Sequence, residues 1–441
     1  MWAKIGREPA LPVVFFGVFS VLLGLLRERA VASQLGVSSA TDAFYLASAL
    51  LLFFPSLVNG ASQGILAPQF ARAMLRSGPT EAKRHLEQLL FIVLGLGAAA
   101  AVVGLLGQGI ASFLYGTEMS ERTKLTMTAA AWLAFTVPSL CFATTGVTAL
   151  NVLGRYWLGA ASTCLAPLVA TLSLYMFEPS MTTFAGGVVL GLGLQTAIVA
   201  LALARDGVIL TRRPPWSAAR VLLKDMSVVG TGVVAAASTP LVIQAVVAGL
   251  GDNALTHYTL GTKITTGFIG MTALILSSIL TPMISARASG LPYSRMRLRI
   301  YLWLTAVVCL GSTLVLTLWP ESVVQFFLGR ALAPPEMAHV ARVQFYAALQ
   351  IPAFILLFLG MRAVQAYHAV KFVTAMNWVQ AALTLALGLA LHAHLGLVGI
   401  LAAGALSYTT CGVCYLLKYR QLDRRAKRAR APVLRPAAAL R

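Results

Sequence analysis

Twelve long apolar runs constrain this chain more than any other feature of its sequence. A helix needs about 20 apolar residues to cross a bilayer, and the hydrocarbon offers no water to satisfy exposed backbone groups. The runs therefore predict an all-α integral membrane protein with twelve transmembrane helices. We expect these helices at 10–35, 43–70, 88–113, 125–150, 157–177, 184–204, 226–250, 257–286, 300–319, 340–366, 372–392 and 397–417.

The distribution of charge predicts the orientation of these helices. Only 11% of the residues are charged, against about 25% in a soluble protein, yet the formal net charge is +20. If the N-terminus lies inside, most basic residues fall in inside segments, and the outside segments carry only Arg122, Lys124 and Arg330. Basic loops stay on the cytoplasmic side, so we expect N-in and C-in topology with an uncleaved first helix. No soluble basic domain suited to nucleic acid is present.

An internal repeat is visible at one constant spacing along the chain. Pro138-x7-Gly146 matches Pro352-x7-Gly360, and Pro68 matches Pro282 at the same separation, which we call the repeat spacing. It covers six predicted helices, an even number, so both copies enter the membrane in the same direction and the repeat is parallel. We therefore expect two facing six-helix bundles, at 1–204 and 226–417, joined by a basic linker at 205–225. A basic cytoplasmic tail would occupy 418–441, and its segment 421–441 would be disordered or lie on the lipid surface.

Charged residues deep within the predicted helices are the candidate functional residues. Charge inside a bilayer costs at least about 2.5 kcal/mol per residue, so Arg27, Arg29 and Lys263 suggest a binding site. Their repeat mates are apolar, which indicates that the charges do not serve the scaffold that both copies share. Two acidic residues, Glu28 and Asp42, are candidate supporting charges.

The roles of these charges stay open at this point. Neighbouring helical residues diverge by about 100°, so one arginine would face substrate and the other would pair internally. Alternatively, Glu28 and an arginine form a structural ion pair, and Asp42 serves the N-terminal dipole of its own helix.

Other polar motifs indicate no enzyme and no resident cofactor. Cys411-x-x-Cys414 lies within an apolar helix, and His392-x-His394 at a helix end has no acidic or cysteine partner nearby, so both are interpreted as structural and no metal is expected. The sequence contains no recognisable catalytic set or phosphate loop. A coupling ion, if one exists, stays unidentified.

The opening of the chain resembles the MurJ (MviN) family of lipid-linked oligosaccharide flippases, in the multidrug/oligosaccharidyl-lipid/polysaccharide exporter superfamily. The resemblance rests on Leu23-Gly24-x2-Arg27-Glu28-x3-Ala32-x3-Gly36-x5-Asp42-Ala43-Phe44, with further matches at Leu150-Asn151-x3-Arg155-Tyr156, Tyr258-x4-Lys263 and Leu280-x-Pro282. It implies two lobes around a cationic cavity that binds the pyrophosphate of an undecaprenyl-linked sugar. Arg27, Glu28 and Asp42 fall on charged positions of the family motif, and Lys263 replaces an arginine.

This sequence also departs from the family pattern. Leu57-Val58-Asn59 replaces an arginine pair, Val21 replaces another arginine, and two C-terminal helices are missing. The resemblance therefore implies a bacterial inner-membrane flippase for a polyprenyl-pyrophosphate-linked oligosaccharide, more consistent with another polysaccharide repeat unit than with lipid II. Its partners would be that substrate, membrane lipid and polysaccharide assembly proteins, but not nucleic acid.

Two alternatives remain. A cation-coupled multidrug antiporter of the same superfamily needs a deep carboxylate, for which Glu28 is the clearest candidate, and the seventh predicted helix (226–250) contains none. A scaffold without transport activity leaves buried Arg27 and Lys263 without a role.

Overall fold

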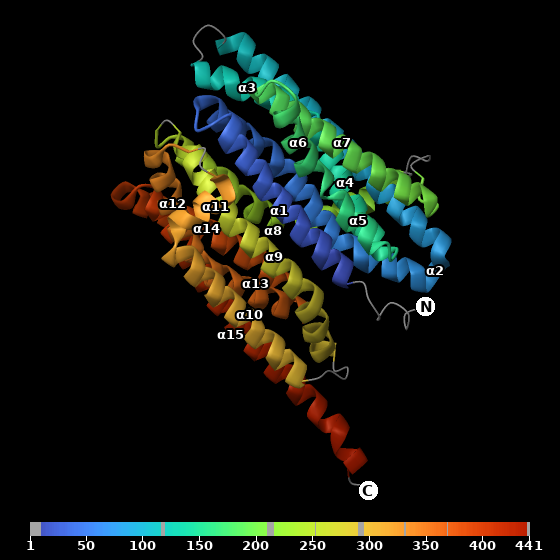
Figure 1. Ribbon diagram of the computed structural model, residues 1–441. Coiled ribbons are helices and arrows are strands. Elements are labelled where there is room, and N and C mark those ends of the chain that lie inside the picture. Colours follow the sequence, from blue (N-terminus) through green and yellow to red (C-terminus); the bar gives the residue numbers. More distant parts are fainter. Residues whose placement is uncertain are drawn as a thin grey trace. The chain divides into compact units, whose positions relative to one another are not determined.

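Every element that the structure describes is an α-helix (Figure 1). The computed structural model describes residues 10–115, 120–209, 216–251, 253–289, 295–329, 332–367 and 369–438. The prediction of an all-α membrane fold is confirmed. The helices are α1 (Ala10–Gln34), α2 (Ser39–Tyr115), α3 (Glu121–Ala134), α4 (Thr136–Val152), α5 (Tyr156–Ser162), α6 (Leu165–Met176), α7 (Met181–Arg205), α8 (Trp216–Ala248), α9 (Ala254–Ser289), α10 (Arg295–Leu318), α11 (Pro320–Leu328), α12 (Pro334–Ala348), α13 (Gln350–Ala366), α14 (Val370–Leu395) and α15 (Leu397–Ala438).

Not every expected transmembrane helix meets the requirements of length and apolarity. Within the described ranges nine spans are long and apolar enough, or ten if the bent pair α3 and α4 counts as one span. Helix α1 is 25 residues long but carries Arg27, Glu28 and Arg29 in its second half. The count of twelve and the N-in, C-in topology stay predictions.

Proline divides three of the expected helices in two. Helices α3 and α4 meet at an angle of 46°, and Pro138 is the third residue of α4. Proline cannot donate to the carbonyl four residues earlier and clashes with it. For Pro138 that carbonyl belongs to Ala134, the last residue of α3. The same effect of proline on the residue four positions earlier explains why α12 ends shortly before Pro352. It also explains why the break between α5 and α6 lies shortly before Pro167.

Three further boundaries differ from the sequence expectation. Helix α2 joins two expected helices through a kink at Gly78, where φ is +85° and glycine is favoured because it has no Cβ. The short helix α11, with Val324 and Leu328 buried, was not expected. Helix α15 continues to Ala438, so the tail is helical where the sequence left disorder open.

The internal repeat is evident in the helix boundaries. Helices α4 and α13 are both 17 residues long, and their first and last residues are separated by the repeat spacing. Helices α1 and α8 end at Gln34 and Ala248, which are separated by the same distance along the chain. The repeat is therefore a property of the secondary structure as well as of the sequence, and its parallel direction stays a prediction.

The chain divides into two compact units. Unit 1 comprises Met1–Gly267 and Glu321–Ala341, and unit 2 comprises Phe268–Pro320 and Arg342–Arg441. These bounds differ from the expected lobes because α8 and the first part of α9 pack with the helices of unit 1. The lobe boundaries 1–204 and 226–417, and the linker between them, stay predictions. Residues 210–215 of that linker lie outside the described ranges.

Each unit has its own apolar core. In unit 1, Leu90 of α2, Leu150 of α4 and Val199 of α7 are buried against one another. In unit 2, Val364 of α13, Met376 of α14 and Tyr415 of α15 do the same. Large apolar side chains are also exposed, Trp303 by 73% and Phe113 by 88%. Exposed apolar surface on this scale suits contact with lipid tails.

Candidate substrate-binding site

A buried carboxylate in α1 brings together the predicted cations of unit 1. The Glu28 side chain is only 1% exposed, and its Oε1 lies 2.5 Å from Arg27 Nη2. Lys263 Nζ, from α9, lies 4.0 Å from the same oxygen. The hydroxyl of Tyr45 on α2 donates to Glu28 Oε2 at 2.6 Å. A buried carboxylate needs such partners, because leaving it unpaired would cost several kcal/mol.

The cluster of Arg27, Glu28, Tyr45 and Lys263 carries one uncompensated positive charge. Two cations share one carboxylate, and both remain accessible: the Arg27 side chain is 27% exposed and that of Lys263 is 42% exposed. Arg27 Nε is buried and has no hydrogen-bond partner in the described part of the chain. The exposed parts of Arg27 and Lys263, rather than the buried Nε, offer N–H donors and net charge to an anion. Phosphate oxygens are strong acceptors for such groups.

Arg29 lies apart from this cluster. Its side chain is exposed, and a Cβ built on Gly329, just after α11, would lie 3.2 Å from Arg29 Nε. Thus Arg27, rather than Arg29, shares a carboxylate with Lys263. Of the two arginines, the sequence alone could not decide which one would do so.

Asp42 forms a joint between the beginnings of two equivalent helices. Its side chain is fully buried, and Oδ1 accepts from the backbone N–H of Thr256 at 2.7 Å and from the Thr256 hydroxyl. Ser38, not Asp42, accepts from the Thr41 amide at the start of α2. Asp42 therefore caps the third residue of α9, and the alternative in which it serves its own helix is not what the contacts show. Thr256 is the repeat mate of Asp42, since 214 residues separate them.

Arg122 fastens this joint to two more helices. Its Nη2 lies 3.1 Å from Asp42 Oδ2, and its Nη1 donates to the carbonyl of Ala248, the last residue of α8, at 3.0 Å. The sequence placed Arg122 only in an outside loop. We call the set Asp42, Arg122, Ala248 and Thr256 the α2–α9 joint.

A separate ion pair ties the end of α7 to the loop after α4. Arg155 binds Asp206 through Nε at 3.2 Å and Nη2 at 3.0 Å, and Lys83 donates to the Asp206 carbonyl at 2.6 Å. The hydrogen bonds to Asp206 and its negative charge raise the pKa of the exposed Arg155. This motif residue thus has a structural partner.

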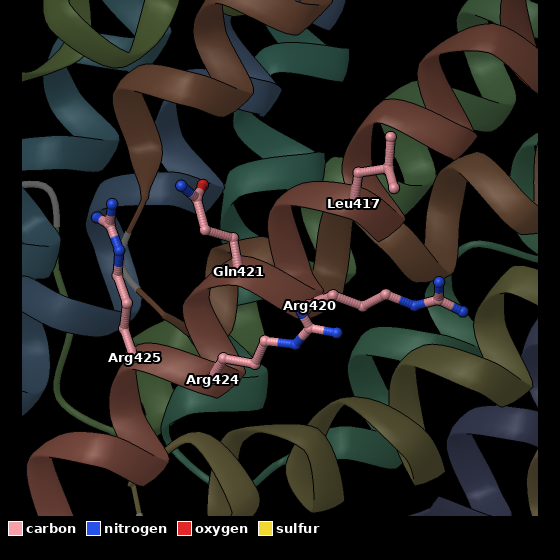
Figure 2. Close-up of a pocket in the computed structure, with 5 residues that line it drawn as sticks. All are labelled: Leu417, Arg420, Gln421, Arg424 and Arg425. Carbon is pink, nitrogen blue, oxygen red and sulfur yellow. The ribbon is translucent and has the colours of Figure 1, made fainter.

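A second basic surface lies on α15 in unit 2 (Figure 2). Arg420, Arg424 and Arg425 line a hollow of about 450 Å³ together with Leu417 and Gln421. All five side chains project from one helix (Figure 2). The hydrogen bond from the Tyr367 hydroxyl to Asp423 at 2.8 Å holds α15 to the end of α13. Guanidinium groups beyond the apolar part of a membrane helix suit anionic headgroups.

The described residues include no group of three histidine, cysteine, aspartate or glutamate side chains placed to hold a metal ion. Cys411 is buried and Cys414 partly buried, and both are free thiols. His392 and His394 lie in the last turn of α14.

The long apolar helices are those of a multi-pass membrane protein. The sequence model of the lipid II flippase MurJ family matches residues 31–437, and the chain belongs to that family. The match begins at Val31, so Arg27, Glu28 and Arg29 lie before it. The search of curated proteins found no match to this sequence.

Solved structures with the same fold come from two branches of one superfamily. A MurJ lipid II flippase in an inward closed conformation is 15% identical, with a TM-score of 0.75 over 94% of this chain and 90% of that one. An inward-facing MATE multidrug transporter is 14% identical, with a TM-score of 0.71 over 96% and 99%. The Vibrio cholerae MATE transporter VcmN in its bent form is 16% identical, with a TM-score of 0.66 over 96% and 97%. At these identities the likeness establishes the fold.

Proposed function

We propose that this flippase-family protein carries a polyprenyl-pyrophosphate-linked oligosaccharide across the bacterial inner membrane by alternating access. The observation that supports it most is the shared carboxylate, since Glu28 holds Arg27 and Lys263 within reach of one anion. The lipid tail and sugar differ among such substrates, whereas the pyrophosphate is their common charge. Arg27, Lys263 and a contribution from Arg29 would bind that pyrophosphate.

In this proposal Glu28 acts as the counter-ion that the substrate displaces. Lys263 Nζ is 4.0 Å from Glu28 Oε1, longer than a normal hydrogen bond. Its ammonium group can therefore turn to a phosphate oxygen while Arg27 and Tyr45 keep Glu28 satisfied. A substrate that binds one conformation better than another shifts the equilibrium between them.

The α2–α9 joint supports the alternating-access part of the proposal. Asp42 and Thr256 belong to different copies of the repeat, and hydrogen bonds of a buried carboxylate join them. Hydrogen bonds to charged groups are individually worth about 1.5–3 kcal/mol. In this proposal, substrate binding favours the form in which these hydrogen bonds are broken.

A cation-coupled multidrug antiporter is the second candidate, because MATE transporters share this fold. That function requires a carboxylate free to exchange a cation for a drug. Both oxygens of Glu28 already have partners, and Asp42 is committed to Thr256 and Arg122. These contacts favour the flippase.

Substitution of Lys263 tests the proposed site. Lys263→Ala should reduce flipping of a fluorescent polyprenyl-pyrophosphate sugar in proteoliposomes by about ten- to hundred-fold, the loss expected for one charged contact. Lys263→Arg should retain partial activity, since charge matters more here than bidentate geometry. Lys124→Ala, an exposed lysine on α3, is the matched control and should flip normally.

The same assay separates the substrate classes. Unlabelled lipids can be added as competitors of the fluorescent substrate. If only lipid II inhibits its flipping, lipid II is the substrate, whereas inhibition by another lipid-linked repeat unit would support the proposal as stated. Normal flipping by a folded Lys263→Ala protein would remove Lys263 from the site. Export of a drug by the protein in the absence of lipid-linked sugar would favour the antiporter.

A further inference from the structure

Two histidines lie beside the α2–α9 joint and have no role in the site above. His257 is the fourth residue of α9 and follows Thr256 directly, and His339 lies on α12. Their rings are 5.5 Å apart between centroids, with an angle of 25° between planes. Both belong to unit 1. The stacked rings therefore connect the first turn of α9 to the first half of α12.

The two rings differ in their hydrogen bonds. His339 Nδ1 lies 2.7 Å from the carbonyl of Pro335, so Nδ1 carries the hydrogen and Nε2 is the acceptor. His257 Nε2 is buried and has no hydrogen-bond partner in the described chain. A neutral ring can leave that nitrogen as a bare lone pair. An imidazolium must carry a hydrogen on both nitrogens.

The internal repeat allows the start of α9 to be compared with its equivalent in the first copy, the start of α2. In the first copy, Arg122 of α3 binds Asp42 at the start of α2. The repeat mates of these two residues, one repeat spacing later, are Glu336 and Thr256. In the second copy, then, a carboxylate stands where the first copy has a guanidinium, and the neighbouring basic group is His257. The charge of arginine is fixed, whereas that of histidine changes near neutral pH.

Charged groups from three directions act on His257. Glu336 and His339 belong to α12 and Asp42 to α2, and Arg122 of α3 is bound to Asp42. Burial of the ring opposes a proton on His257 most, and the second imidazole opposes it too. The partial positive charge at the start of α9 acts in the same direction, whereas the two carboxylates favour the proton.

We propose that His257 and His339 form a proton-binding site that makes the α2–α9 joint sensitive to pH. The packed arrangement accommodates the neutral stack, because the buried Nε2 has no acceptor for an added N–H. Protonation therefore favours an arrangement in which the rings separate and the first turn of α9 loosens. The stability of the joint falls as pH drops below about 6.5, the usual midpoint of histidine.

Histidine NMR tests proton binding directly. The chain has six histidines, and ring carbon signals of the full-length protein in nanodiscs can be titrated individually. Replacing His339 with phenylalanine, which keeps a stacking ring, should raise the His257 midpoint if the two form one site, because a neighbouring imidazole that opposes the proton is removed. His392→Phe, on α14, is the matched control and should shift neither signal. A His257 midpoint that is unchanged in His339→Phe would overturn the shared site.

Hydrogen exchange at Thr256 tests the effect on the joint. The Thr256 amide is the third of α9, so it has no partner within the helix and its protection reports the bond to Asp42. One linked proton changes an equilibrium by at most ten-fold per pH unit. Exchange, corrected for the intrinsic rate, should therefore rise by up to about ten-fold from pH 6.5 to 5.5. It should stay within about two-fold in the double variant H257F/H339F.

These readings need no substrate, so they can fail while the proposed function holds. An unchanged Thr256 protection over this range in the unaltered protein would overturn the proposal. So would the same pH response in H257F/H339F, since Asp42 or Glu336 would then be the titrating group.

Discussion

At the scale of single residues, the contacts of Glu28 give a role to Tyr45, which the sequence analysis did not identify. Tyr45 is 6% exposed and directs its hydroxyl to Glu28 Oε2. Arg27 and Lys263 approach the other oxygen. The carboxylate thus has a fixed neutral partner on one side and two cations on the other. Tyr45 positions Glu28 so that its charge organises the cations.

Removing the Tyr45 hydroxyl should destabilise the protein. Tyr45→Phe leaves a buried carboxylate oxygen without its donor, at a cost of about 1–3 kcal/mol. We expect a lower melting temperature in detergent, followed by intrinsic fluorescence. Tyr175→Phe, at a tyrosine that is 56% exposed, should melt like the unaltered protein. Equal melting of both variants would mean that Glu28 finds another donor.

At the scale of helices, glycine decides how closely α6 and α7 approach. Gly187 and Gly191 lie four residues apart on α7, a spacing typical of closely packed membrane helices. In the structure a Cβ built on Gly191 would lie 2.8 Å from Ala166 Cα and 3.0 Å from the Ala166 carbonyl oxygen. Both are backbone atoms of α6, which cannot turn aside as a side chain can. Gly191 is therefore a structural glycine in the contact between α6 and α7.

A methyl group at this position should separate the two helices. Gly191→Ala should cost about 1–3 kcal/mol, the range for overpacking in a close-packed interior, and lower the melting temperature in detergent. Gly193 lies two residues further along the same helix, and a Cβ there meets nothing within 4 Å. Gly193→Ala should therefore be neutral or slightly stabilising, because alanine is the better helix former. The reverse order of stability would contradict the packing of α6 against α7.

At the scale of the whole molecule, the orientation in the membrane follows from the basic residues. Reporter fusions at Gly116, Asp252 and Glu336 should lie in the periplasm, and fusions at Ser77, Pro215 and Leu434 in the cytoplasm. Of these positions, Gly116, Pro215 and Asp252 lie outside the described ranges. The physical reason is the retention of basic loops on the cytoplasmic side. Two reporter enzymes, one active only in the periplasm and one only in the cytoplasm, measure the side on which each fusion site lies. A single internal site on the wrong side would show that the count of twelve helices is incorrect.

The sequence by itself determined the features that depend on local chemistry. Apolar runs predicted the helices, because backbone groups in lipid must bond within their own segment. The recurrence of Pro138 as Pro352 predicted the repeat, and each proline is indeed the third residue of its helix. The charges of Arg27, Glu28 and Lys263 indicated a candidate site, because charge is rare in lipid.

Only the tertiary structure decided which of those charges meet. Arg27 and Arg29 are equivalent in the sequence, but α1 turns one towards Glu28 and Lys263 and the other towards Gly329. Tyr45, Arg122 and Thr256 carry ordinary side chains for helix ends and loops, and no local pattern marks them. Thr256 reaches Asp42 because two helices that are far apart in the sequence begin side by side. Hydrogen bonds and ion pairs act over about 3–4 Å, and at that range helix packing, rather than sequence spacing, sets the partners.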